Sequence, residues 1–368
     1  TMHFTIQREA LLKPLQLVAG VVERRQTLPV LSNVLLVVEG QQLSLSGTDL
    51  EVELVGRVSL EEPAESGEIT VPARKLMDIC KSLSSDALID VRVDDQKLLI
   101  KSGRSRFTLS TLPANDFPSV EEGPGSLGFS VAQSKLRRLI ERTGFAMAQQ
   151  DVRYYLNGML LEVNAGVLRA VATDGHRLAM CALSADIPHA DRHQVIVPRK
   201  GILELARLLT EQDGEVAVTL GQHHIRATTG EFTFTSKLVD GKFPDYERVL
   251  PRGGDKVVIG DRQQLREAFS RTAILSNEKY RGIRLQLASG LLKLQANNPE
   301  QEEAEEEVAV DYQGAALEIG FNVSYLLDVL GVMGAEQVRL VLSDANSSAL
   351  LQEADNDDSS YVVMPMRL

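Results

Sequence analysis

The segment Thr173-Asp174-Gly175-His176-Arg177 brings together the residue types of a catalytic dyad. An aspartate beside a histidine can orient the imidazole that activates a nucleophile. However, Thr48-Asp49-Leu50 repeats the Thr-Asp pair without a histidine. We therefore expect Thr-Asp to be a structural turn whose aspartate caps backbone amides, with Gly-His-Arg as a polar addition. A hydrolase that uses Asp174 and His176 in an interdomain cleft is the alternative from a different functional class.

Two further patterns are similar to ligand sites. Gly123 to Gly128 matches G-x-G-x-x-G, which binds phosphate only between a buried strand and an opening helix. Here two glutamates precede the match and a strand is expected to follow, so we interpret it as an interdomain linker. His189 and His193 have metal-ligand spacing, and His223-His224 adds two imidazoles, but no carboxylate or thiolate is placed beside them. We expect no metal, no cofactor and no catalytic residue.

The elements that would position these segments recur three times along the chain. A strand-like entry into an apolar-periodic helix includes Phe4, then Phe129, then Val258. The Thr of the Thr-Asp pair follows 44 residues after each of the two phenylalanines, and a strand-like segment begins 103 residues after all three landmarks. A fixed period is typical of tandem structural repeats. The expected domains are residues 1–126, 127–253 and 254–368.

Each repeat is expected to contain two helices and about eight strands. A second helix starts near Pro72, Pro198 and Phe321, in the middle of each repeat. Short β-type runs lie between the helices, separated by hairpin-like turns such as Glu39-Gly40-Gln41. The order β-α-β-β-β followed by α-β-β-β indicates an α+β fold, with antiparallel sheets on one side and helices on the other.

Charge is placed unevenly in an otherwise ordinary globular composition. The 368 residues are 43% hydrophobic and carry a net charge of −12. The longest apolar runs fall short of 18 residues, no leader pattern opens the chain, and two cysteines are too few for a disulfide framework, so we expect a cytoplasmic protein. Basic residues nevertheless gather in the helix-like stretches of all repeats. For one helix a solvated face explains this, but the recurrence favours a shared positive surface.

The acidic run Glu302–Glu307 is typical of a solvated loop or edge strand. It lies in the third repeat, whereas Lys75, Arg104 and Arg106 surround Phe107 in the first. If the first and third repeats of two chains meet, these charges would steer a head-to-tail contact, and a heterologous contact of this kind can close into a ring.

Several long segments carry a resemblance that covers essentially the whole chain. They are Val71–Lys75, Ser102–Phe107, Gln150–Gly158, Ala172–Leu178, Thr235–Tyr246 and Tyr361–Leu368. In these segments the sequence resembles the bacterial sliding clamps, the β subunits of the replicative DNA polymerase III. The resemblance implies three clamp-fold domains per chain and a head-to-tail homodimer whose six domains form a ring around duplex DNA. Helices would line the hole, sheets would lie outside, and a separate ATP-dependent loader would open the ring.

The resemblance also implies a pocket shared by partner proteins through short linear motifs. These partners are the replicative polymerase catalytic subunit, the clamp loader, translesion polymerases, mismatch-repair proteins and ligase. The implied pocket residues are Leu156, Thr173, Gly175, His176, Arg177, Leu178, Pro244, Arg248, Val249, Asn322, Tyr325, Asn346, Ser348, Met364, Pro365, Met366 and Arg367.

We expect contacts with DNA that carry no sequence specificity. Contacts between the two chains are expected at other positions. The DNA contacts implied by the resemblance are Arg25, Gln150, Tyr154, Tyr155, Arg74, Lys200 and Arg281. The expected dimer interface comprises Lys75, Arg104, Arg106, Phe107, Leu109, Ile274, Leu275, Glu300, Glu302, Glu303 and Glu305. Neither a membrane nor an enzymatic reaction is expected; a scaffold that never meets nucleic acid is the remaining alternative.

Overall fold

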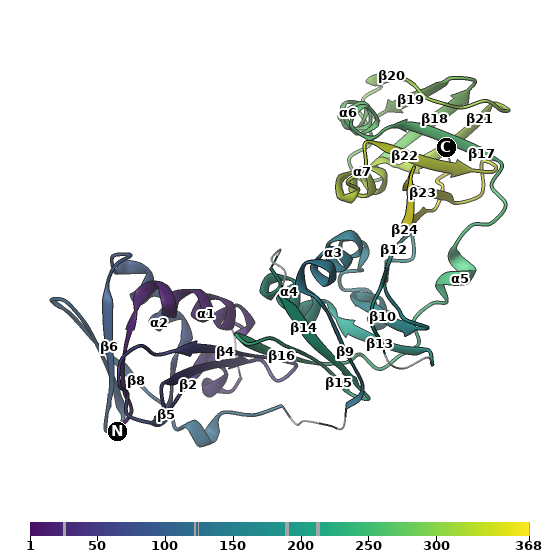
Figure 1. The fold of residues 1–368 in the computed structure, drawn as a ribbon. Helices are drawn as coiled ribbons and strands as arrows, with labels where there is room; N and C mark the ends of the chain where they lie inside the picture. Colours follow the sequence, from purple (N-terminus) through teal and green to yellow (C-terminus); the bar gives the residue numbers. More distant parts are fainter. Residues whose placement is uncertain (25–26, 121–122, 124, 188–190, 211–213, 368) are drawn as a thin grey trace. The chain divides into compact units, whose positions relative to one another are not determined.

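A computed structural model describes residues 1–24, 27–120, 123, 125–187, 191–210 and 214–367 (Figure 1). The chain divides into two compact units. Unit 1 comprises Thr1–Leu136, Asp186–Pro188 and Lys200–Val239, and unit 2 comprises Arg137–Ala185, His189–Arg199 and Asp240–Leu368. The units do not follow the three sequence repeats, because strands of neighbouring repeats join into common sheets.

The first repeat contains two helices and eight strands, in line with the expected content, but the strand directly before the second helix is absent from the expected order. Helix α1 buries Leu11, Leu15 and Val18, the spacing of an amphipathic helix with one apolar face. The elements are β1 (His3–Gln7), α1 (Arg8–Val21), β2 (Asn33–Glu39), β3 (Gln42–Thr48), β4 (Val52–Ser59), β5 (Gly67–Pro72), α2 (Ala73–Ser82), β6 (Leu88–Asp94), β7 (Lys97–Ser102) and β8 (Ser105–Ser110), with 3₁₀ turns at Pro29–Ser32 and Ala114–Asp116.

The second repeat has the same order but starts earlier than expected. Strand β9 begins at Gly125 and pairs with β14, so interpreting Gly125–Gly128 as a linker was wrong. The expected domain boundary after residue 126 falls inside this strand. The elements are β9 (Gly125–Ala132), α3 (Gln133–Thr143), β10 (Gly158–Asn164), β11 (Val167–Thr173), β12 (Arg177–Ser184), β13 (His193–Pro198), α4 (Arg199–Leu208), β14 (Glu215–Gly221), β15 (His224–Thr228) and β16 (Phe232–Lys237), with 3₁₀ turns at Gly144–Ala146 and Tyr154–Asn157.

The third repeat follows a short helix, α5 (Tyr246–Val249), and its two long helices begin with side-chain caps. Asp261 accepts a hydrogen bond from the Gln264 amide, and Asn322 accepts one from the Ser324 amide. The elements are β17 (Lys256–Asp261), α6 (Arg262–Ala273), β18 (Gly282–Ala288), β19 (Leu291–Asn297), β20 (Glu303–Ala309), β21 (Leu317–Asn322), α7 (Val323–Val332), β22 (Gln337–Leu342), β23 (Ala349–Glu353) and β24 (Asn356–Val363).

Two eight-stranded antiparallel sheets run across the boundaries between repeats. In unit 1 the order is β5-β2-β3-β4-β16-β15-β14-β9, and in unit 2 it is β13-β10-β11-β12-β24-β23-β22-β17. Each sheet takes four strands from each of two consecutive repeats, which meet at β4–β16 or at β12–β24. The other two sheets have four strands each, β1-β6-β7-β8 in unit 1 and β20-β19-β18-β21 in unit 2.

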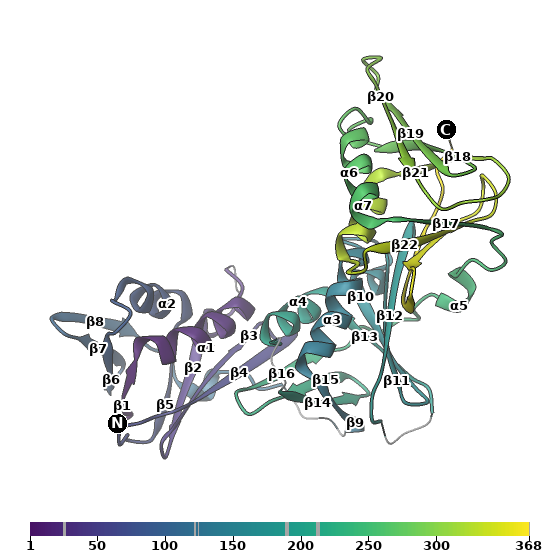
Figure 2. The same ribbon diagram turned by 45° about the horizontal axis from the view of Figure 1, so that its top comes forward.

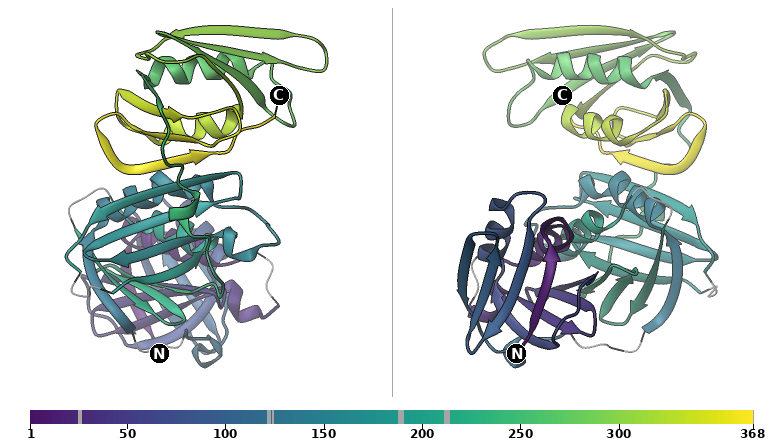
Figure 3. Two further views of the ribbon diagram at one scale, coloured as in Figure 1. Left: turned by 90° about the vertical axis from the view of Figure 1, so that its right-hand side faces the viewer. Right: turned by 60° about the vertical axis from the view of Figure 1, so that its left-hand side comes forward.

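The helices pack in pairs against these sheets. In the first repeat α1 contacts α2 and the strands β3 and β4 (Figure 2). In the third repeat α6 contacts α7, β19 and β20, and Figure 3 shows both helices between strands of the two sheets. Large apolar side chains such as Phe4, Phe234, Phe321 and Tyr361 are fully buried in the resulting cores. Within the described residues, no helix is long and apolar enough to cross a membrane.

Candidate peptide-binding and DNA-contact sites

The Thr173-Asp174 pair forms the structural turn that its repetition predicts. Thr173 Oγ1 donates to the Arg177 carbonyl (2.6 Å) and accepts from the Gly175 amide (3.2 Å). Asp174 Oδ1 accepts from the backbone amides of His176 (2.9 Å) and Arg177 (3.1 Å), and Oδ2 accepts from Arg177 Nε (3.2 Å). The carboxylate therefore binds backbone and guanidinium groups, which leaves this segment without the Asp–His geometry of a dyad.

The equivalent turn in the first repeat has the same hydrogen bonds, although Leu50 stands where the second repeat has Gly175. Thr48 Oγ1 donates to the Val52 carbonyl and accepts from the Leu50 amide, and Asp49 Oδ1 accepts from the amides of Glu51 and Val52. The position after the aspartate has positive φ in both turns, +79° at Leu50 and +90° at Gly175. Glycine adopts this conformation without a steric penalty, whereas leucine adopts it only at a steric cost.

Arg177 is the centre of a cluster in unit 2. Its Nη1 lies 2.5 Å from Asp328 Oδ2 on α7, and its guanidinium lies 4.5 Å from the centroid of the Tyr325 ring and 5.3 Å from that of Phe145. The His176 ring is stacked on Tyr325, with 6.4 Å between centroids and 19° between planes. Neither Phe145 nor Asp328 was predicted, because no sequence motif marks either residue. Together these contacts hold the turn against α7 through charge and cation–π attraction.

The C-terminal segment runs along the same turn. Arg177 of β12 pairs with Val363 of β24, after which the Met364 amide donates to the His176 carbonyl (3.1 Å). The Met366 amide donates to the Gly320 carbonyl of β21 (2.7 Å). Met364 is 45% exposed, so an adaptable apolar side chain is presented to solvent beside His176.

The remaining predicted pocket residues lie on several other segments of unit 2. Leu156 is buried in the 3₁₀ turn Tyr154–Asn157, whereas Asn322 is the cap of α7. Asn346 and Ser348 lie in the turn before β23, whose first residue, Ala349, pairs with Val363. Pro244, Arg248 and Val249 belong to the segment that contains α5, and the Arg248 side chain is largely exposed. The structure thus connects His176, Arg177, Tyr325 and Met364 by direct contacts, whereas Met366 is bonded to Gly320 of β21. Leu178, Pro365 and Arg367 adjoin these residues in the chain.

The predicted DNA-contact residues differ in the solvent exposure of their side chains and in the bonds that these side chains make within the chain. Gln150, Tyr154 and Arg74 are exposed, and the Tyr154 and Tyr155 rings meet edge to face with 5.8 Å between centroids. Exposed tyrosine, glutamine and arginine side chains suit contacts with phosphate and sugar. Arg25 lies outside the described residues.

Lys200 and Arg281 are bound to groups of their own chain. Lys200 Nζ donates to Glu23 Oε1 (2.5 Å), Asp49 Oδ2 (2.5 Å) and the Val21 carbonyl (2.9 Å). Burial opposes the charge of Lys200, but Asp49 and Glu23 together raise its pKa above the usual value. The Arg281 guanidinium donates to Ser324 Oγ, Ser276 Oγ and the Ala273 carbonyl, all at 3.1 Å. Both cations therefore also stabilise local structure.

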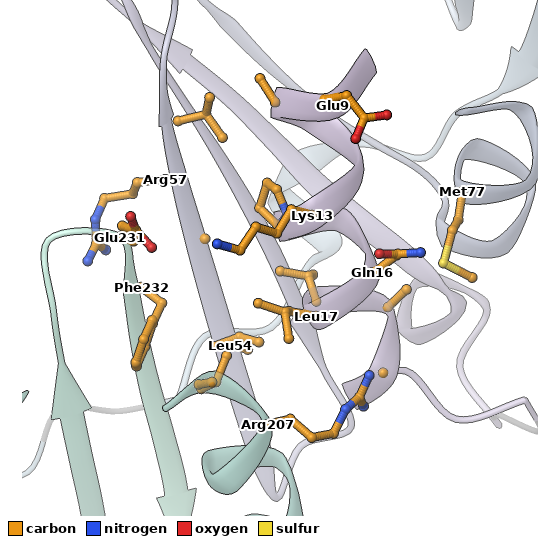
Figure 4. A pocket seen from close by; sticks show the side chains of 18 of the residues that line it. Glu9, Lys13, Gln16, Leu17, Leu54, Arg57, Met77, Arg207, Glu231 and Phe232 are labelled. Atoms are coloured by element: carbon orange, nitrogen blue, oxygen red, sulfur yellow. The ribbon is translucent and has the colours of Figure 1, made fainter. Parts of the chain in front are cut away.

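A basic groove surrounds α1 in unit 1. It has a volume of about 910 Å³ and includes the apolar residues Leu17, Leu54 and Phe232 (Figure 4). Its lining contains the cations Lys13, Arg57, Arg74, Lys81 and Arg207 but only the two acids Glu9 and Glu231. An acidic chain thus presents a locally positive surface on the first two repeats, which fits phosphate contacts.

Most of the expected interface residues lie on or next to β8 and β20, each of which is one edge strand of a four-stranded sheet. Arg104 and Arg106 are exposed at β8, with Phe107 half-buried and Leu109 buried. Glu303 and Glu305 are exposed on β20, with Glu302 just before it and Glu300 in the preceding turn. Ile274, at the end of α6, is 75% exposed, an unusual position for a large aliphatic side chain. Lys75 on α2 is exposed and Leu275 is half-buried.

The predicted histidine pattern falls partly outside the residues that the structure describes. Within the described residues, no group of three or more His, Cys, Asp or Glu side chains could hold a metal ion. His189 lies outside those residues, and His193 opens strand β13.

Comparison with known proteins extends over the whole chain. The models of the N-terminal, central and C-terminal domains of the DNA polymerase III beta subunit match residues 2–121, 130–245 and 247–367. The beta sliding clamp of Pseudomonas aeruginosa is 87% identical over 367 residues, which are 100% of each chain. A crystal structure of that organism's clamp bound to griselimycin is 87% identical, covers 100% of both chains and has a TM-score of 0.98.

A more distant structure has the same fold. The Caulobacter crescentus beta sliding clamp, crystallised with PEG at a proposed β-motif tethering region, is 42% identical, covers 100% of this chain and 99% of its own, and has a TM-score of 0.93. The chain therefore belongs to the DNA polymerase III beta subunit family, the bacterial beta sliding clamps.

Proposed function

We propose that this DNA sliding clamp, the non-catalytic processivity factor of DNA polymerase III, acts as a head-to-tail homodimer. The order of strands in the sheets carries this proposal. Strands β4 and β16, and likewise β12 and β24, join the half-sheets of consecutive repeats into eight strands. Their equivalents β20 and β8 are edges of four-stranded sheets within the described chain. Pairing β20 of one chain with β8 of a second gives the order β21-β18-β19-β20-β8-β7-β6-β1, the same order as in the two complete sheets.

Side chains at the two edges support this pairing. The β8 edge carries Arg104 and Arg106, and the β20 edge carries Glu303 and Glu305, so their charges are complementary. Ile274 would bury its exposed side chain in the same contact. Because one chain supplies β8 and the other β20, the contact is heterologous, and two copies of it close a ring.

Double-stranded DNA is the proposed occupant of that ring. Six repeats, proposed as residues 1–126, 127–253 and 254–368 of two chains, would direct the basic faces of α1, α2 and α4 inward. The proposed contacts are Arg25, Gln150, Tyr154, Tyr155 and Arg74, with Lys200 and Arg281 contributing beside their structural bonds. Phosphate contacts carry no sequence information, so the ring can slide, and leaving the DNA requires opening an interface.

The cluster around Arg177 and Tyr325 is the proposed docking pocket for linear motifs of partner proteins. The exposed Met364 and the stacked His176–Tyr325 pair support it. The griselimycin complex of the 87% identical relative makes griselimycin the natural probe for this chain. The proposed partners are the polymerase catalytic subunit, the clamp loader, translesion polymerases, mismatch-repair proteins and ligase, in the cytoplasm.

Mass in solution tests the dimer, and griselimycin binding tests the pocket. We expect sedimentation at micromolar concentration to give twice the chain mass of 40.4 kDa. A monomer that persists at high concentration and on DNA would contradict the ring. We expect Tyr325→Ala and His176→Ala to weaken griselimycin binding; unchanged affinity in both variants would place the pocket elsewhere.

A further inference from the structure

The segment that follows the second repeat is fixed to that repeat by one tyrosine. Tyr246 on α5 is 5% exposed, and its hydroxyl donates to Glu162 Oε1 on β10 (2.7 Å). Glu162 itself is 0% exposed. A carboxylate removed from water in this way needs hydrogen-bond donors around it.

Both oxygens of Glu162 are fully engaged. Oε1 also accepts from Arg169 Nη1 (3.0 Å), while Oε2 accepts from Gln194 Nε2 (2.6 Å) and Arg192 Nε (2.8 Å). Burial opposes ionisation, but the bonds from Tyr246, Gln194 and Arg192 bring the pKa of Glu162 below its usual range. The group is therefore an ionised carboxylate at neutral pH.

Tyr246 is held by more than its hydroxyl. The Arg169 guanidinium lies 5.2 Å from the centroid of its ring and that of Arg192 lies 6.0 Å away. Arg169 Nη1 also donates to the tyrosine oxygen (2.9 Å). The aromatic ring thus lies beside two guanidinium groups, and the Glu162 carboxylate offsets one of their two positive charges.

The strand register is the same in the three repeats, but the residue types at equivalent positions differ. In the second repeat Glu162 pairs across the sheet with Arg169 and Gln194. The same register brings together Val37, Ser44 and Glu68 in the first repeat, and Gln286, Lys293 and Glu318 in the third. The buried Glu–Arg–Tyr arrangement is therefore an addition to the common scaffold, like the Gly-His-Arg of the same repeat.

This addition anchors the segment that supplies Pro244, Arg248 and Val249. In the short helix, Tyr246 points into the cluster while the adjacent Arg248 side chain is exposed. We propose that Glu162 and Tyr246 are positioning residues for the peptide pocket, holding the segment Asp240–Pro251 as one of its walls. The proposal rests on the proposed pocket and concerns residues that themselves touch no ligand.

Two conservative substitutions in the full-length protein test this inference. Tyr246→Phe removes one hydroxyl and keeps the ring, and Glu162→Gln keeps the shape of the side chain but removes its charge. Tyr312→Phe is the matched control, because Tyr312 is 3% exposed and its hydroxyl donates to a backbone carbonyl of the third repeat. The readouts are amide hydrogen exchange of Asp240–Pro251 and the affinity for griselimycin.

We expect Tyr246→Phe and Glu162→Gln each to speed exchange in this segment about tenfold and to weaken griselimycin about three- to tenfold. The double variant should show less than the sum of the two single changes, because both substitutions remove the same Tyr246–Glu162 hydrogen bond. Tyr312→Phe should leave both readouts unchanged.

Unchanged exchange in Asp240–Pro251 would overturn the anchoring claim. Faster exchange with unchanged griselimycin affinity would overturn the claim that the anchor serves the pocket. Failure of the proposed pocket has a different signature, namely that Tyr325→Ala binds griselimycin as tightly as the unaltered chain.

Discussion

The guanidinium of Arg177 lies 4.5 Å from the centre of the Tyr325 ring, at the point where the second and third repeats share a sheet. The same group binds Asp328 on α7 and Asp174 in its own turn. One side chain thus orders the aromatic floor of the proposed pocket and both segments beside it. Planarity and several donors make arginine suited to this arrangement.

Arg177→Lys should therefore weaken griselimycin binding although it keeps the charge. Lysine cannot stack on Tyr325 and bridge two carboxylates at once, so we expect a loss of about tenfold, measured by calorimetry. Arg57→Lys in unit 1 is the control, because that arginine also bonds within its sheet but far along the chain from the pocket. Equal affinities for Arg177→Lys and the unaltered protein would contradict the role of Arg177.

The paired turns predict opposite effects at Leu50 and Gly175. Leu50 has φ of +79° and is 41% exposed, so Leu50→Asn should relieve backbone strain at little cost in burial. We expect it to raise the melting temperature by roughly 1–4 °C. Gly175→Ala should lower it, because φ is +90° and the new Cβ would lie 3.0 Å from the Arg153 guanidinium. Changes of the same sign in both variants would show that strain does not govern these turns.

Buried glutamates predict opposite responses to pH in the second repeat. The pKa of Glu162 is lowered, so its stabilising contribution is present above the unfolded pKa near 4.5 and is lost as the pH falls through the folded value. At pH 7.5, Glu162→Gln should reduce the melting temperature by roughly 3–10 °C. The difference should shrink as the pH approaches 4, since a protonated glutamate is similar to glutamine.

Glu204 provides the comparison of opposite sign. Burial raises its pKa despite the nearby Arg207, so stability from this group is present below the unfolded pKa and is lost as the pH rises through the folded value. Glu204→Gln should therefore increase the melting temperature at pH 7.5 and have less effect near pH 4. Calorimetric scans of Glu162→Gln and Glu204→Gln between pH 4 and 7.5 give the sign of each change in melting temperature. A lower melting temperature of Glu204→Gln at neutral pH would contradict the raised pKa of Glu204.

Ile274 should be important for the dimer and not for the fold. Its side chain is 75% exposed, so truncation to alanine removes apolar area that only a partner chain can bury. We expect Ile274→Ala to raise the dissociation constant of the dimer about tenfold or more, with an unchanged melting temperature of the monomer. Leu203→Ala is the control, since Leu203 is 47% exposed on α4 outside the proposed interface. Sedimentation equilibrium measures both, and equal dissociation constants would argue against this interface.

Much of the architecture was predictable because it is periodic. The recurring distances from Phe4 and Phe129 place both helices and most strands, and the shared Thr-Asp pair distinguishes a turn from a catalytic site. The strand before each second helix escaped prediction, since Gly67–Pro72 is short and ends in a proline. Pairing of β4 with β16 was also outside reach, because no local pattern specifies which edges meet across more than a hundred residues.

The ion-pair and hydrogen-bond partners of individual charged side chains were the least predictable feature of the structure. Sequence alone marks Lys200 as one basic residue on a helix, but only folding brings Asp49 and Glu23 to it. Glu162 appears as the single charge of an apolar strand, and only the strand register shows Arg169 and Gln194 beside it. Exposure of Arg74, by contrast, follows from helix periodicity and agrees with a role in DNA contact.

Release from DNA ends tests the central claim most directly. The protein is loaded onto a nicked circular plasmid by a clamp loader with ATP, separated from free protein, and the plasmid is then cut once. A ring that encircles DNA without base-specific contacts should stay on the intact circle and leave within the time of cleavage. Retention on the linear product would contradict topological linkage, and failure to remain on the circle would contradict the ring itself.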